Sequence, residues 1–441
     1  MPDVGKVSDT QEKLPWDHIR IGNKSYDANK LSSFHPGGPL FISAFAGRDA
    51  SQAFVSYHRK PFPHQKVKFA LEKEDQTIPS PDPHLNDEFF ELVRRVEKVL
   101  PRQKSFATWG FYLKALILLT ICFGSEAYMH YTVTYKWYLT GLLGMMEAIM
   151  ALNITHDALH GSLSANPRVN RFFSLFHHVY SGTVTTWVHQ HVVQHHVHTN
   201  DIHRDPDISG QRAMRLNPLR PLKKMHAYQY IYFFGLFFIY GLTIFNFTIS
   251  TVAKAFYFTS FSPMLQKYRI FDAIGLAIFH LRWTILPVYQ TQSLLTLFHT
   301  VPLMIGFGTY MATFFHISHN FEGVEQFEDS GPRRSWLYHQ VASSSNVAGT
   351  ILCTINGGLN YQIEHHLFPR VYHGHYPTIA PIVRQFCEER SIPYRHFPTL
   401  SENMLSTVKH MYDFGVNKVP DAAKNLKGLG SQKAMGVSLS G

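Results

Sequence analysis

Three separate clusters in this 441-residue chain combine histidine with the spacing of metal ligands. The first two each contain a histidine pair four positions apart, and the third contains a glutamine followed by two histidines. Residues three or four apart share one face of a helix, so the side chains of each cluster can reach one ion. The residues concerned are His156, His160, His191, His195, His196, Gln362, His365 and His366.

The number of histidines in these clusters favours a centre with two metal ions. Imidazole is a good ligand for iron, zinc, copper and nickel. Zinc usually takes three or four protein ligands, so seven histidines exceed the need of a single zinc ion. A pair of irons held mainly by imidazole is therefore the preferred interpretation, with structural zinc as the rival.

A fourth pattern indicates haem. His35 opens the run His-Pro-Gly-Gly, and His58 follows 23 positions later. A rigid Pro-Gly-Gly turn can hold one imidazole beside a porphyrin while the second approaches from the opposite wall. Ligation by two histidines leaves no open site on the iron, which favours electron transfer over oxygen binding.

Long apolar segments must position these clusters. Residues 109–131 and 137–155 can each cross a bilayer, and residues 228–250, 271–289 and 294–317 are three further candidates. Of these three, the segment 271–289 is the poorest, because it contains Asp272, His280 and Arg282.

The histidine clusters lie on both sides of this last block of segments. If all of them bind one centre, an even number of crossings must separate them, so we expect four spans in total. Lys and Arg residues before residues 109 and 228 place the clusters, the haem motif and both termini in the cytosol.

The composition narrows the function classes. The 41 Lys and Arg exceed the 31 Asp and Glu, but the basic residues flank apolar segments, so we expect membrane lipid and no nucleic acid as the partner. The three cysteines form no disulfide framework. No signal peptide is expected, because the first hundred residues lack a long apolar run.

The haem motif and its surroundings resemble cytochrome b5. The similar stretches are "YDANKLSSFHPGG" and "AGRDASQAF", and the resemblance covers about sixty residues. It implies haem b held by His35 and His58 in a small α+β domain. It also implies an external reductase, NADH-cytochrome b5 reductase, as the electron donor.

The histidine clusters resemble those of membrane fatty acid desaturases, as do "HTNDIHRDPD", "SHNFEG" and "GGLNYQIEHHLFPR". The resemblance implies two non-haem irons bound by the eight residues of the clusters and by His319 from the last span, with His316 as the less favoured choice. In other membrane desaturases an Asn precedes that histidine by one turn, whereas here the position is Phe315. We expect Asp157, Asn200, Asp205 and Asp207 to orient the imidazoles.

These resemblances predict a mainly α fold: a four-span helical bundle with a cytosolic, histidine-rich di-iron cap and a small N-terminal α+β domain. The expected parts are a haem domain at 14–75, a linker with an amphipathic helix lying on the membrane surface at 76–106, a desaturase domain at 107–400, and an extension with a disordered end at 401–441.

The resemblance implies a membrane enzyme, expected in the endoplasmic reticulum, that uses O2 to insert a cis double bond into a polyunsaturated acyl lipid or acyl-CoA. Gln362, which opens the third cluster, resembles the "front-end" branch, where the new bond forms between an existing one and the carboxyl end. We expect delta-5 activity, then delta-6. The alternatives are a sphingolipid long-chain-base delta-8 desaturase, a lipid hydroxylase, and a non-catalytic haem electron carrier with structural zinc.

Overall fold

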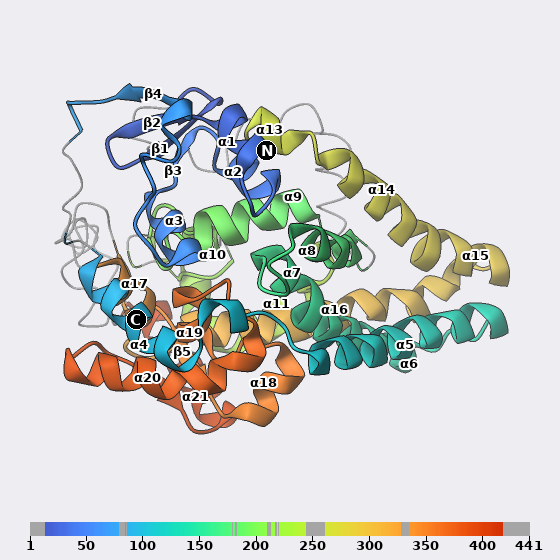
Figure 1. Cartoon of the computed structure of the whole chain (residues 1–441). Coiled ribbons are helices and arrows are strands. Elements are labelled where there is room, and N and C mark those ends of the chain that lie inside the picture. Colours follow the sequence, from blue (N-terminus) through green and yellow to red (C-terminus); the bar gives the residue numbers. More distant parts are fainter. Residues whose placement is uncertain are drawn as a thin grey trace.

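The computed structural model describes residues 14–78, 84, 86–178, 180, 183–209, 213–216, 218, 220–243, 261–327 and 335–417. The chain is mainly helical, with four candidate membrane spans and a small α+β unit at the N-terminal side, as the sequence predicts. Figure 1 shows this unit, in blue, against the same side of the molecule as the helices that carry the histidine clusters, while α5, α6 and α15 project away from it.

The N-terminal unit is built on a four-stranded sheet in the order β3-β1-β2-β4. Strands β1 and β2 form an antiparallel hairpin because Gly22 adopts the left-handed conformation that the tight turn requires, with φ at 63°. Short helices follow the sheet and enclose its apolar face. The elements are β1 (His18–Ile21), β2 (Lys24–Asp27), α1 (Ala28–Phe34), α2 (Pro39–Phe45), β3 (Arg48–Asp49), α3 (Ser51–His58), η1 (Lys68–Ala70) and β4 (Leu71–Glu74).

Helix α4 (Asp87–Val99) is amphipathic as expected, but its apolar face is covered by protein. Its apolar side chains are buried in one core with α20 (Tyr376–Glu389) and α17 (Trp336–Ala342). Phe89, for example, packs edge-on against Trp336, with the ring centroids 5.2 Å apart. An apolar helix face fits a protein groove as well as a bilayer, so the pattern alone could not separate the two.

Four helical segments are long and apolar enough to cross a bilayer: Arg102–Thr132, Trp137–His160, Pro263–Thr291 and Leu294–His319. They consist of η2 (Arg102–Lys104) and α5 (Trp109–Thr132); α6 (Trp137–Met150), η3 (Ala151–His156) and α7 (Asp157–His160); α13 (Pro263–Gln266), α14 (Arg269–His280), η7 (Leu281–Ile285) and α15 (Leu286–Thr291); and η8 (Leu294–Thr296) and α16 (Leu297–His319).

Within the described residues, the number of candidate spans agrees with the four expected, but the segment judged the poorest from the sequence, 271–289, lies within one of them. Its polar groups are satisfied inside the protein, which makes its place in a span possible. The Arg282 guanidinium pairs with Glu126 of α5, and the Asp272 carboxylate accepts hydrogen bonds from the backbone N–H groups of Val184 and Thr185.

The apolar segment 228–250, preferred as a span from the sequence, contains the short helix α11 (Gln229–Tyr240) within the part of the chain that the structure describes. The residues from 244 to 260 lie outside the described ranges. Helix α11 packs against α16 and against α21 (Leu400–Gly415), with Phe233 and Phe237 buried between them. The start of the expected C-terminal extension is therefore part of the folded body, and its end lies outside the described residues.

The backbones of helices α6 and α16 are in direct contact. A Cβ added to Gly144 would overlap the carbonyl group of Leu303, and one added to Gly306 would overlap the carbonyl of Gly141. Small residues that allow such close approach are typical of helix contacts inside membranes. Since both spans end on the same side, this contact brings His160, at the end of the first, close to His319, at the end of the second.

The remaining helices and strands form a cap at that end of the spans. Its core is the large apolar cluster shared by α4, α17, α19 and α20, and strands β5 and β6 pair in parallel beside it. The elements not yet given are α8 (Pro167–Ser174), η4 (Leu175–His178), α9 (Val184–Trp187), η5 (Val188–His195), α10 (Pro206–Ser209), η6 (Lys224–Tyr228), β5 (Ser345–Val347), α18 (Thr350–Asn356), α19 (Gln362–Leu367), η9 (His373–His375) and β6 (Arg395–Phe397).

Candidate metal centre

Seven of the predicted histidine ligands form two adjacent buried groups. His156, His160, His191 and His365 make up the first group, in which one ring nitrogen of each residue lies within 4.8 Å of the others. The second group meets the same criterion and comprises His195, His319 and His366. The rings from all three sequence clusters thus converge at one end of the helical bundle.

The second cluster owes its geometry to a π-helical turn in η5. The backbone N–H of His196 donates to the carbonyl oxygen of His191, five residues earlier, at 2.9 Å. This wider turn brings residues five apart onto one face, and the Nε2 atoms of His191 and His196 lie 3.1 Å apart. Such turns are frequent at functional sites. The sequence predicted an α-helical alignment of His191 with His195 and gave no sign of the extra alignment.

His196 lies between the two groups. Its Nε2 atom is 3.0 Å from Nε2 of His365, in the first group. Its ring stacks on His366, in the second, with centroids 4.3 Å apart. His196 can therefore supply a ligand atom where the two groups meet.

Gln362 contacts the second group. Its side-chain amide nitrogen lies 2.8 Å from Nε2 of His319 and 3.3 Å from Nε2 of His366. The two ends of an amide have nearly the same shape, so the opposite orientation places the oxygen, which is the metal-binding atom, at this position.

The outward-facing Nδ1 atoms of five of these histidines are fixed by hydrogen-bond partners. Metal-binding imidazoles typically donate this second N–H to such a partner, which sets the tautomer and the ring orientation. The pairs are His160 with the Tyr57 hydroxyl (2.8 Å), His195 with the Asp205 carboxylate (3.1 Å), His319 with the Ser343 carbonyl (2.9 Å), His365 with the Tyr376 hydroxyl (3.2 Å) and His366 with the Gln340 side-chain oxygen (2.8 Å).

These partners were only partly predicted. Asp205 contacts His195 as expected, and Asp207 lies 3.3 Å from the same nitrogen. Asn200 acts on an imidazole only indirectly, because its side-chain amide donates a hydrogen bond to the backbone carbonyl of His319. Asp157 differs from the expectation, since its carboxylate accepts a hydrogen bond from His373 at 2.6 Å. Tyr57, Gln340, Ser343 and Tyr376 were missed, because their sequence surroundings carry no motif.

The electrostatics of the cluster favour ligand binding. Burial lowers the pKa values of His191, His196, His365 and His366 well below the usual range, so these imidazoles are neutral and their lone pairs are available. At His195 burial also lowers the pKa, but the carboxylates of Asp205 and Asp207 outweigh it and raise the value to about 9. The same carboxylates make His195 a more basic ligand when a metal ion replaces its proton.

The cluster fits a pair of metal ions. Buried polar atoms nearly always have hydrogen-bond partners, yet several side-chain atoms of this cluster have none, including both ring nitrogens of His156 and Nε2 of His160. Buried lone pairs without hydrogen-bond donors are what metal ions require. An imidazole-rich set of this kind is consistent with a di-iron site.

The structure also separates His319 from His316. His319 belongs to the second group, whereas the ring of His316 packs against Phe233 and Phe237, with centroids 5.6 and 5.2 Å away. The two residues are three positions apart on α16, and only His319 reaches the cluster.

The two histidines of the haem motif face each other in the N-terminal unit. Their ring centroids lie 5.9 Å apart, and each Nδ1–H donates to a backbone carbonyl, that of Gly38 for His35 and that of Phe54 for His58. Both Nε2 atoms remain for an iron. Burial lowers the pKa of both imidazoles, to about 3 for His58, which keeps them neutral. A Cβ on Gly37 would lie 2.9 Å from the His35 ring, which explains a glycine at this position.

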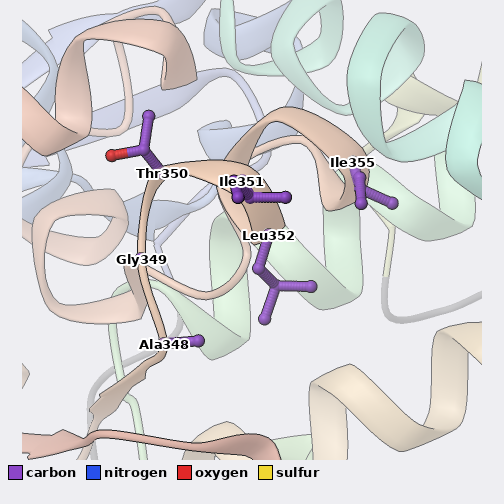
Figure 2. A pocket seen from close by; sticks show the side chains of 6 residues that line it. All are labelled: Ala348, Gly349, Thr350, Ile351, Leu352 and Ile355. Atoms are coloured by element: carbon purple, nitrogen blue, oxygen red, sulfur yellow. The ribbon is translucent and has the colours of Figure 1, made fainter.

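An apolar hollow on the surface lies over α18 and the turn before it (Figure 2). Its lining residues are Ala348, Gly349, Thr350, Ile351, Leu352 and Ile355. None of them has a titratable or strongly metal-binding side chain, so the hollow offers no acid, base or metal ligand. The exposed apolar side chain of Ile351 suits contact with lipid.

The contact between Asp205 and His195 leads to a testable prediction. Replacing Asp205 with Asn preserves the shape but removes the charge that holds the Nδ1 proton, so we expect affinity for the non-haem metal to fall by about 10- to 100-fold. Metal content after dialysis against graded chelator concentrations measures this loss. Asp201→Asn is the matched control, because this neighbouring buried carboxylate pairs with Arg204 and contacts no metal-site histidine. Equal metal retention in both variants would contradict the prediction.

These features define a class of protein: a helical membrane protein with a histidine-lined candidate metal centre and an attached haem-type domain. The family description "Fatty acid desaturase" matches residues 132–398, and "Cytochrome b5-like Heme/Steroid binding domain" matches residues 9–98. The chain therefore belongs to the fatty acid desaturase family. It is a front-end desaturase, an oxidoreductase of fatty acyl lipids, with a fused cytochrome b5 domain that implies haem and an electron-donating reductase.

Named relatives cover nearly the whole chain. An "Acyl-lipid (7-3)-desaturase" from Rebecca salina is 38% identical over 90% of this chain and 90% of its own length. A protein of the same name from Diacronema lutheri is 35% identical over 92% of both chains. The "Delta(5) fatty acid desaturase A" of Dictyostelium discoideum is 28% identical, again over 92% of both.

Proposed function

We propose that this enzyme inserts a cis double bond at carbon 4 of an acyl lipid whose first existing double bond is at carbon 7. The observation that carries the proposal is the difference in identity: 38%, 35% and 29% to three relatives named as (7-3)-desaturases, against 26% and 28% to two relatives named as delta-5 enzymes. All five matches cover about nine tenths of this chain, so coverage of the chain does not explain the difference. The delta-5 activity expected from the sequence is the second candidate.

We assign the metal ligands from the two groups of ring nitrogens. One iron is held by His156, His160, His191 and His365, and the other by His195, His319 and His366, with His196 and Gln362 where the groups meet. The haem is held by His35 and His58. The proposed boundaries are those expected above, with the haem domain at 14–75 and the desaturase domain at 107–400.

When bound, the iron pair supplies the O2 activation that the removal of hydrogen from an unactivated methylene requires. The residues of the chain hold the ligand imidazoles in position for that chemistry. The hydrogen bonds at Nδ1 hold five imidazoles with their other nitrogens turned inward. The rings of Trp187 and Phe315 lie beside His191, with centroids 4.5 and 6.1 Å away, and give the first group apolar neighbours.

The cellular location, the electron donor and the route of the substrate are inferred from the domains of the enzyme. An integral membrane protein with its basic residues and histidines at one end of the spans suits the cytosolic face of the endoplasmic reticulum. There NADH-cytochrome b5 reductase would reduce the haem domain, and the acyl chain, carried on lipid or on coenzyme A, would approach the cluster from the bilayer between the spans.

Expression in yeast tests the proposed position of the new bond. The cells receive fatty acids whose first double bond is at carbon 7, 8 or 9, and gas chromatography with mass spectrometry identifies the products. We expect a delta-4 product from the first acid. A product only from the second or third acid would replace the assignment with delta-5 or delta-6, and hydroxylated lipids or altered long-chain bases would favour the other lipid-modifying alternatives. Two non-haem irons per purified chain, rather than zinc, separate the enzyme from a haem electron carrier.

A further inference from the structure

One side chain of the haem domain reaches the metal cluster. Tyr57 directly precedes the haem-motif histidine His58 in α3, and its hydroxyl lies 2.8 Å from Nδ1 of His160. The two rings are nearly parallel, with 22° between their planes and 6.2 Å between their centroids. Residues 103 positions apart in the sequence therefore join the two cofactor sites through a single hydrogen bond.

The direction of this hydrogen bond follows from the chemistry of a ligand histidine. Nε2 of His160 faces the cluster and has no hydrogen-bond partner. An imidazole that binds a metal through Nε2 keeps its proton on Nδ1 and needs an acceptor there. For His195, His319, His365 and His366 that acceptor comes from the desaturase body itself. His160 instead takes its acceptor, the Tyr57 oxygen, from the haem domain.

The position of Tyr57 does not depend on its hydroxyl group. Its ring packs against Phe41 at 5.4 Å, within an apolar core shared by the haem domain and the helices of the metal site. That core contains Leu159, the neighbour of His160, and Val188 and Val192 of η5. Removal of the hydroxyl therefore deletes the hydrogen bond but leaves the packing between the two parts.

We propose that Tyr57 is a positioning residue that orients His160 and connects the haem to the iron pair for electron transfer. The connection runs from the His58 imidazole through the adjoining backbone to Tyr57, and then across one hydrogen bond to His160. Each transfer oxidises one ferrous haem to ferric haem and reduces one ferric non-haem iron to ferrous iron. Two transfers serve each double bond, and the hydrogen bond itself is neither formed nor broken. The proposal rests on the function proposed above.

Tyr57→Phe in the full-length protein tests this role. Stopped-flow absorbance follows reoxidation of the reduced haem after mixing with O2 and substrate. We expect reoxidation to slow by about tenfold or more, while the haem spectrum and the content of two non-haem irons stay as in the wild type. A first turnover from protein reduced at all of its irons should slow much less, because the iron pair already holds its electrons and only the orientation of His160 is affected.

Tyr376→Phe is the matched control, because it removes the same kind of hydrogen bond from another ligand, His365, within the desaturase body. We expect it to change haem reoxidation and the first turnover by the same factor, whereas Tyr57→Phe slows haem reoxidation more than the first turnover. Haem reoxidation within twofold of the wild type in Tyr57→Phe, or equal slowing of both steps, would overturn the proposal. A wild-type protein without non-haem iron or product would instead contradict the proposed function.

Discussion

His366→Ala should abolish desaturation while leaving the haem spectrum unchanged. His366 is one of three histidines in the second metal group, its ring stacks on His196, and its Nδ1 is fixed by Gln340. Alanine removes a ligand that no neighbouring side chain can replace, since the other rings are already fixed. We expect product below the detection limit in yeast and a loss of about one of the two non-haem irons.

Two measurements make this result specific. Non-haem iron is determined in the purified variant, and the haem absorbance band reports on the N-terminal unit. His396→Ala is the matched control, because this histidine is exposed and its Nε2 contacts only the Ala348 carbonyl. It should retain both the iron and the product. Product near the wild-type amount in His366→Ala would remove the third cluster from the metal site.

His35→Ala should cause the second large loss, that of the haem. His35 faces His58 across 5.9 Å, and its loss leaves the haem with one protein ligand and with space where the ring had been. We expect the haem absorbance band to disappear and NADH-dependent turnover to stop, while the non-haem iron content stays at two per chain. Absorbance spectra and metal analysis of the same preparation measure both outcomes.

Added soluble cytochrome b5 provides a rescue for this variant. If His35→Ala affects only electron supply, the external protein should restore part of the turnover by reducing the iron pair directly. His18→Ala is the control, because this histidine of the haem domain pairs with the exposed Asp17 and takes no part in the motif. A haem band of wild-type intensity in His35→Ala would show that another residue binds the iron.

The sequence predicted which histidines come together in one buried cluster, and the reason is physical. Ligand spacing is a local property, and the requirement that every cluster reach one centre also set the number of spans. The same requirement could not say which segment crosses the bilayer. Asp272 and Arg282 made one candidate look too polar, and only the folded chain shows that their charges are paired with groups from other helices.

Other residues of the site were missed in the sequence for a different reason. Tyr57, Gln340 and Tyr376 act on the histidines through contacts between distant parts of the chain, and nothing in their immediate sequence marks them. The π-helical turn in η5 was missed because its defining hydrogen bond, from His196 to His191, leaves no mark in the spacing of residue types. Residue types predict what can bind a metal, whereas the orientation of each ligand is a property of the whole fold.

The glycine contact between α6 and α16 determines more than how two helices pack. The ends of these helices carry histidines of different groups, His160 in the first and His319 in the second. Gly144 and Gly306 lie inside the spans, yet they limit how far the two ligand sets can separate. The spacing of the two histidine groups, on which shared oxygen chemistry at the proposed irons would depend, thus rests in part on backbone contact inside the candidate spans, away from the histidines themselves.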